Sequence, residues 1–127
     1  MIEAIHHVAL IASDYARSKR FYVDVLGFAL VEEHCRAERE SWKGDLAIGA
    51  IRLELFSFPE TPPRPTRPEA QGLRHLAFAV RDIDAAVARL TAHGVAAEPI
   101  RTDPYTGSRF TFFADPDGLP LELYEMR

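Results

Sequence analysis

The chain repeats three kinds of residue at one spacing of 68 positions: a histidine in an apolar strand, an aspartate before a helix, and a glutamate between two leucines. The pairs are His7 and His75, Asp14 and Asp82, and Glu54 and Glu122. Three chemically distinct markers that share one offset are hard to produce by chance, so we expect two copies of one folding module. Two copies are too few for a solenoid. The repeat therefore predicts two half-cups packed side by side.

Each copy follows the order strand, helix, strands. Apolar alternation predicts strands in the first copy over 4–11, 28–36, 45–48 and 52–58. A helix is predicted over about 14–26, because Asp14 is a good N-cap and Gly27 a stop signal. The second copy is predicted to have strands over 74–80, 96–101, 110–114 and 120–124, a helix over 82–92 ended by Gly94, and a tight turn at 115–118.

A proline-rich segment separates the two copies. Residues 59–68 hold five prolines, and such a stretch is extended and cannot join a sheet ladder. The sequence therefore predicts one domain over residues 1–127, with module one over about 1–58, a connector over 59–71 and module two over about 72–127. The predicted fold class is α+β, with two tandem βαβββ modules.

The composition disfavours several kinds of partner. The 127 residues carry a net charge of −4, whereas nucleic-acid-binding domains usually show a basic excess. Residues 1–16 have neither the basic start of a signal peptide nor the apolar length of a spanning helix. Cys35 is the single cysteine, so no intramolecular disulfide can form and a reducing compartment is the simplest location. We expect a cytoplasmic protein that binds a small molecule, and neither nucleic acid nor membrane.

The repeated histidines and glutamates are predicted to share one face of the sheet, opposite their apolar neighbours. Burying Glu54 and Glu122 together without a cation would be very unfavourable. A divalent cation removes this difficulty, and the imidazoles of His7 and His75 complete four ligands that suit Ni, Co, Zn, Mn or Fe. A single strand histidine is more often structural, and a strand glutamate is usually just solvated. The recurrence of both residues in both copies favours the metal site.

The three remaining histidines have structural interpretations. His6 is next to His7 and is predicted to face the other way. His34 and His93 have no partner in the repeat. His93 precedes Gly94 and is predicted to cap the end of the second helix.

Several motifs resemble those of the vicinal oxygen chelate superfamily, to which glyoxalase, bleomycin resistance and extradiol dioxygenase proteins belong. They are IHHVAL at 5–10, FYVDVLGF at 21–28, RHLAF at 74–78, DPDG at 115–118 and LEL at 121–123. The resemblance covers nearly the whole chain. It is strongest to the glyoxalase I (lactoylglutathione lyase) branch and its small bacterial glyoxalase-like subfamily, through residues 40–45, 103–105 and 109–113.

This resemblance implies a cup-shaped mixed sheet, one divalent metal per site, and a homodimer whose sites take ligands from both subunits. It gives His7, Glu54, His75 and Glu122 as the ligands, since the complete His, Glu, His, Glu set is the glyoxalase I pattern. The implied reaction is a proton transfer next to a carbonyl in a hemithioacetal or similar small oxygenated substrate, with the metal stabilising an enediolate. Glu122 would be the general base, and Glu54 its near-symmetric catalytic counterpart.

Two positions depart from the glyoxalase I pattern. Ile11 and Phe58 stand where that family usually has an arginine and an asparagine that contact glutathione. A more apolar concavity is therefore expected, and the thiol portion of the substrate stays open. The candidates for substrate binding are Trp42, Lys43, Arg64, Arg67, Tyr105 and Arg109. The lysine and the arginines among these candidates are interpreted equally well as exposed charged side chains on surface loops.

Two other functions stay open beside the metal-dependent isomerase or lyase. One is a binding protein that sequesters a small molecule without metal chemistry, as resistance relatives do. The other is a non-haem iron dioxygenase, which would need an open facial site for Fe(II). Glu54 argues against the dioxygenase, because it adds a second carboxylate to that site.

Overall fold

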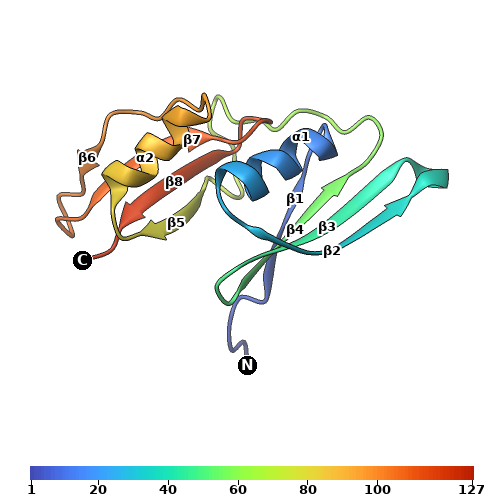
Figure 1. Ribbon diagram of the computed structural model, residues 1–127, viewed down its shortest axis with the longest axis horizontal. Helices are drawn as coiled ribbons and strands as arrows, with labels where there is room; N and C mark the ends of the chain where they lie inside the picture. Colours follow the sequence, from blue (N-terminus) through green and yellow to red (C-terminus); the bar gives the residue numbers. More distant parts are fainter. The chain divides into compact units, whose positions relative to one another are not determined.

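The first half of the chain forms one mixed sheet and one helix (Figure 1). The computed structural model describes residues 1–127, and its first compact unit is Met1–Pro63. The elements of this unit are β1 (His7–Ile11), α1 (Tyr15–Arg20), a π-helical turn (Phe21–Val25), β2 (Ala29–Arg36), a 3-10 turn (Ala37–Arg39), β3 (Ser41–Ile48) and β4 (Ile51–Ser57). The strand order is β1-β4-β3-β2, with β1 parallel to β4 and the other pairs antiparallel.

The second unit, Arg64–Arg127, repeats this arrangement. Its elements are β5 (Leu76–Val80), α2 (Ile83–Ala92), β6 (Arg101–Thr102), β7 (Arg109–Ala114) and β8 (Pro120–Glu125). The strand order is β5-β8-β7-β6, with β5 parallel to β8 and the other pairs antiparallel. The predicted α+β fold with two βαβββ modules is confirmed. None of the helices has the length and apolar character needed to cross a membrane.

Leucines on one face of each sheet form the cores. Leu53 and Leu55 of β4 are buried in the first unit, where α1 lies against β4. Leu121 and Leu123 of β8 are buried in the second, where α2 lies against β8. Because side chains alternate along a strand, the residue between each pair of leucines must point to the opposite face.

The predicted caps are confirmed. The Oδ1 atoms of Asp14 and Asp82 accept hydrogen bonds from the backbone N–H three residues later, at 3.1 and 3.0 Å. Each bond satisfies a donor that a helix start leaves unpaired. His93 is the C-cap of α2, with its Nδ1 2.9 Å from the carbonyl oxygen of Arg89. Gly94 follows with a φ of +74°, which glycine adopts without strain.

Three predicted strands differ from the observed ones by three residues or more. The strand predicted over 4–11 begins only at His7, as β1. The strand predicted over 96–101 is reduced to β6, because Pro99 has no N–H for the ladder. Residues before β6 still run beside β7, since Glu98 donates to the Phe112 carbonyl oxygen at 2.9 Å. In the other direction, β3 begins at Ser41 rather than residue 45, because residues 41–44 pair with β2 across the hairpin.

Candidate functional site

Each unit contains one histidine–glutamate pair formed by two predicted ligands. His7 Nε2 lies 3.6 Å from Glu54 Oε2, and His75 Nε2 lies 3.0 Å from Glu122 Oε2. Two donor atoms that each lie about 2.1 Å from one ion at right angles are about 3.0 Å apart. The His75–Glu122 pair therefore fits adjacent ligands at right angles, and the longer His7–Glu54 distance corresponds to a wider, roughly tetrahedral angle.

The strand register explains why both units build the same pair. Ala9 is opposite Glu54 in the parallel β1–β4 pairing, and Ala77 is opposite Glu122 in the β5–β8 pairing. Each histidine lies two residues before the alanine and so shares the face of the glutamate. The predicted orientation of the two glutamates, away from the buried leucines, is confirmed for each sheet separately.

His6 lies beside His7 rather than simply facing away from it. β1 begins at His7, so His6 precedes the strand, and the two Nδ1 atoms are 2.9 Å apart. One of these nitrogens donates to the other. Such a contact orients the His7 ring with its Nε2 toward Glu54. Histidines that bind metals commonly have a second hydrogen-bond partner of this kind.

Lys43 lies beside Glu54, on the same face of the first sheet. Its Nζ is 3.8 Å from Glu54 Oε1 and 3.5 Å from Asp45 Oδ1, and it lies over the Phe56 ring at 5.8 Å. Trp42, the preceding residue, points to the opposite face and stacks on Tyr15 at 5.0 Å. Lys43 is therefore a neighbour of the predicted ligands, whereas Trp42 packs beside α1.

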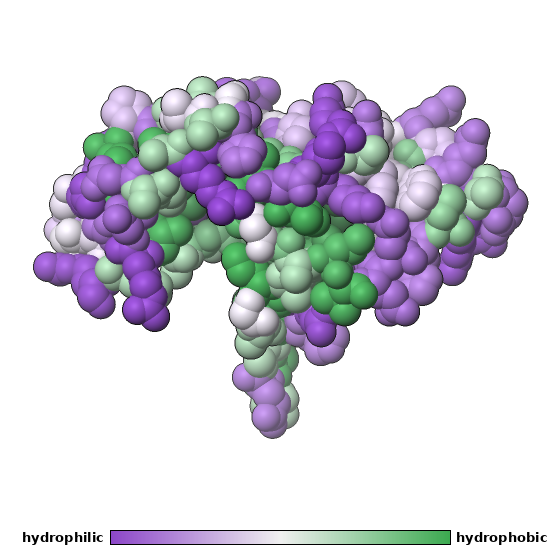
Figure 2. Space-filling model, in the orientation of Figure 1, coloured by the Kyte–Doolittle hydropathy of each residue, from purple (hydrophilic) through white to green (hydrophobic).

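Apolar side chains occupy the two positions that depart from the glyoxalase I pattern. Ile11 is 58% and Phe58 is 43% exposed. Phe58 stacks on Phe56 at 5.9 Å. The visible surface mixes such hydrophobic residues with hydrophilic ones (Figure 2). Neither side chain can bind a carboxylate.

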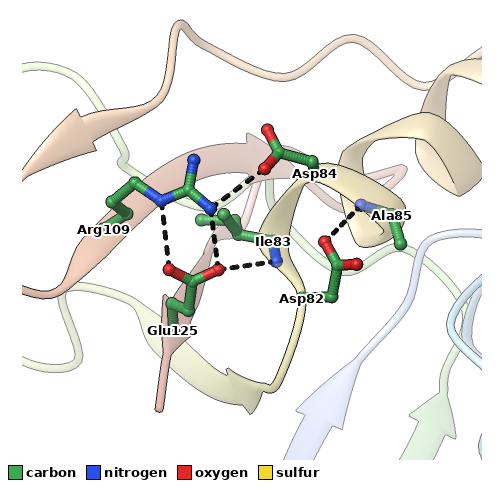
Figure 3. A network of polar contacts seen from close by, with 6 residues as sticks. All are labelled: Asp82, Ile83, Asp84, Ala85, Arg109 and Glu125. Atoms are coloured by element: carbon green, nitrogen blue, oxygen red, sulfur yellow. Dashed lines mark hydrogen bonds and ion pairs between the residues drawn. The ribbon is translucent and has the colours of Figure 1, made fainter. Parts of the chain in front are cut away.

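Arg109 is held by two carboxylates (Figure 3). Its Nε and Nη2 donate to the two oxygens of Glu125, each at 3.0 Å, and Nη2 also donates to Asp84 at 2.9 Å. Glu125 accepts the N–H of Ile83 as well, so the network joins β7 and β8 to the start of α2. Hydrogen bonds from Arg109 hold the pKa of Glu125 below its usual range. A contact between Arg109 and substrate stays a prediction. Such a contact would compete with these ion pairs for the guanidinium.

Replacing Arg109 by methionine is expected to lower the Tm by a few degrees at most at pH 7, since the pair with Asp84 is exposed and the pair with Glu125 only partly buried. The depressed pKa of Glu125 stabilises the folded protein above the unfolded pKa, and this contribution disappears as the pH falls through the folded value. The difference in Tm between wild type and R109M should therefore shrink below about pH 4. Circular dichroism melts at pH 7 and pH 3.5 measure it, with the exposed Arg81→Met as control. A difference that is the same at both pH values would contradict the assignment.

A cavity of about 590 Å³ opens beside His75 in the second unit. Arg64 and Arg67, both predicted substrate-binding residues, line it. Arg74 and Arg101 also line it and were missed by the sequence analysis. The available signal was the position of Arg74, directly before a predicted ligand. Tyr105 is outside the cavity and is 95% exposed.

A separate group of possible ligands lies on β2 and β3. Donor atoms of Glu32, His34 and Asp45 lie within 4.8 Å of one another. His34 Nε2 is 3.5 Å from Glu32 Oε1. Two of these side chains are exposed, and such exposed groups are common without an ion. No repeat in the sequence points to this group, because its members have no counterparts in the second copy.

Comparison with known proteins identifies the relatives of the chain. The family model described as "Glyoxalase/Bleomycin resistance protein/Dioxygenase superfamily" matches residues 4–123. The uncharacterized protein YaeR of Escherichia coli (strain K12) is 66% identical over 98% of this chain and 97% of its own length. The 2-epi-5-epi-valiolone epimerase of an Actinomyces species is 32% identical over 97% of this chain and 79% of its own length. The crystal structure of the glyoxalase family protein from Enterococcus faecalis superposes with a TM-score of 0.89, at 50% identity over 97% of this chain and 98% of that one.

Proposed function

Since the chain belongs to the glyoxalase/bleomycin resistance protein/dioxygenase superfamily, we propose that it is a metal-dependent isomerase or lyase of the glyoxalase I type. The observation that carries this proposal is the pair of histidine–glutamate contacts, at 3.6 and 3.0 Å, built in the same register in both units. We assign His7, Glu54, His75 and Glu122 as ligands of one divalent cation per site. The homodimer implied by the family resemblance is proposed as well, and the molar mass in solution tests it.

A cation held by these residues would supply a Lewis acid that polarises the carbonyl of the substrate. Glu122 is the proposed general base, because it is the less exposed of the two glutamates and lies 3.0 Å from His75. The proton moves from the carbon next to the carbonyl to a Glu122 oxygen and is then returned to the former carbonyl carbon, while the hydroxyl proton passes to the former carbonyl oxygen. Substrate and product are isomers, so the step needs no oxidant or reductant. The name of the epimerase relative supports this class, since an epimerase inverts a stereocentre and a proton removed and returned achieves that.

Replacing His75 by alanine is expected to remove most of the bound metal, because the nitrogen ligand is lost while the strand remains. Protein purified without chelator should contain about one equivalent of metal per site, measured by inductively coupled plasma mass spectrometry. His93→Ala is the matched control, since His93 caps α2 and does not touch the pair.

The same measurement separates the competing functions. His7→Ala should lose the metal as well if both pairs serve one ion. Full metal content in His7→Ala would contradict the four-ligand assignment. A wild-type protein without stoichiometric metal would instead favour the sequestering protein.

A further inference from the structure

We infer that the substrate carries an oxyanion, a carboxylate or a phosphate, that binds in the arginine-lined cavity of the second unit. The inference rests on the proposed function only in calling this ligand a substrate. The cavity has a volume of about 590 Å³, within the range of sites that bind small molecules. Its lining includes four guanidinium groups and two carboxylates, so positive charge is in excess.

One of the four arginines shapes the wall. Arg64 donates from Nη2 to the carbonyl oxygen of Leu73 at 2.8 Å and from Nε to the hydroxyl of Thr66 at 2.9 Å. That hydroxyl donates in turn to the carbonyl oxygen of Gly118 at 3.2 Å. These bonds fix the segment between Arg64 and Leu73 against the turn that precedes β8. Arg64 is therefore a positioning residue, since its Nε and Nη2 donors are directed at the wall itself.

Two more arginines are compensated by carboxylates within the lining. Arg74 Nε lies 2.5 Å from Glu69 Oε1, and Arg101 Nη2 lies 3.2 Å from Glu98 Oε2. Arg101 also lies over the ring of Phe110 at 5.0 Å. These contacts hold both guanidinium groups at the cavity wall and leave little unbalanced charge on either.

Among the lining arginines, Arg64 and Arg67 have no ion pair, and of these two only Arg67 also makes no hydrogen bond to the wall. It lines the cavity, and none of the ion pairs within 4.0 Å involves it. A planar guanidinium in this position can donate two parallel hydrogen bonds to a carboxylate or a phosphate. We therefore assign Arg67 as the primary contact of the oxyanion.

The cavity also adjoins the proposed chemistry. His75 lines it, and the His75 ring packs edge-on against Phe112, another lining residue, at 5.1 Å. A ligand whose oxyanion meets Arg67 can thus lay its carbon skeleton over an apolar floor that ends at a proposed metal ligand. This arrangement selects small anionic substrates over neutral ones.

Isothermal titration of the full chain with inorganic phosphate and with malonate tests the assignment, with neutral malonamide as the uncharged control. Phosphate or malonate should bind the wild type, and Arg67→Gln should weaken binding roughly 10-fold or more, since a charge-assisted bidentate contact is lost. Arg81→Gln is the matched control, because Arg81 is exposed and outside the cavity. Tm and metal content are measured on every variant, so that unfolding or an anion bound to metal is recognised.

The outcomes separate this inference from the proposed function. Tighter binding of phosphate than of malonate assigns a phosphate ester, and the reverse assigns a carboxylate. No binding to wild type, equal binding of malonamide, or equal affinities in wild type and Arg67→Gln would overturn the inference, whatever the metal content. Loss of the metal assignment with oxyanion binding intact would instead overturn the proposed function and leave the anion site standing.

Discussion

Glu122→Gln is expected to lower turnover roughly 10²–10⁴-fold while the protein stays folded and keeps most of its metal. Glutamine retains an oxygen that can ligate a cation but cannot accept the substrate proton. Glu122 is 8% exposed and flanked by buried leucines, so the isosteric amide should fit without rearrangement. The measurement is the rate with methylglyoxal plus glutathione, and with a panel of other thiols, after loading with Ni, Co, Zn or Mn.

Two comparisons make this result interpretable. Glu54→Gln reports on the near-symmetric glutamate of the other unit, and a smaller loss of turnover there would identify Glu122 as the principal base. Glu38→Gln is the control for loss of one negative charge, because Glu38 is exposed on the 3-10 turn. A Glu122→Gln enzyme as fast as wild type would make the base assignment wrong.

Leu121→Ala is expected to lower the free energy of unfolding by about 2–5 kcal/mol. Leu121 is 0% exposed and lies on the face of β8 that α2 covers, so truncation leaves a cavity in a closed core. Urea denaturation followed by circular dichroism measures the change. Leu53→Ala at the equivalent position of the first unit should lose a similar amount, since Leu53 is 2% exposed.

An exposed apolar residue provides the control for these truncations. Val31→Ala on β2 should change the free energy of unfolding by less than about 0.5 kcal/mol, because Val31 is 52% exposed. A loss below about 1 kcal/mol in Leu121→Ala would contradict the assignment of this leucine to a closed core.

The repeat made most of the fold predictable. Caps at Asp14 and Asp82 fix the helix starts, and the Leu-Glu-Leu segments fix which face of β4 and of β8 carries a glutamate. Both members of each histidine–glutamate pair lie on neighbouring strands in a set register, so alternation alone was sufficient to predict their shared face. The prediction of a strand over 96–101 was wrong for most of its length. It relied on the apolar content of this segment, whereas Pro99 lacks the N–H that a strand ladder needs.

The rest of the candidate site depends on contacts between distant segments. Arg101 reaches the cavity from β6, and Arg67 reaches it from the connector, with no periodic pattern to link them. Tertiary packing also decides that Arg109 meets Glu125 and Asp84. Trp42 could not be assigned to the helix face from the sequence, because the strand was predicted to begin at residue 45, whereas Trp42 pairs within β3.

The ligands proposed for the cation come from strands or their ends, whereas Arg64 and Arg67 come from an irregular segment that crosses no sheet. Substitutions in irregular surface segments disturb folding far less than substitutions in ladder strands. Substitutions in this one short stretch could therefore change the preference for the proposed anion, while the residues proposed for proton transfer stay unchanged.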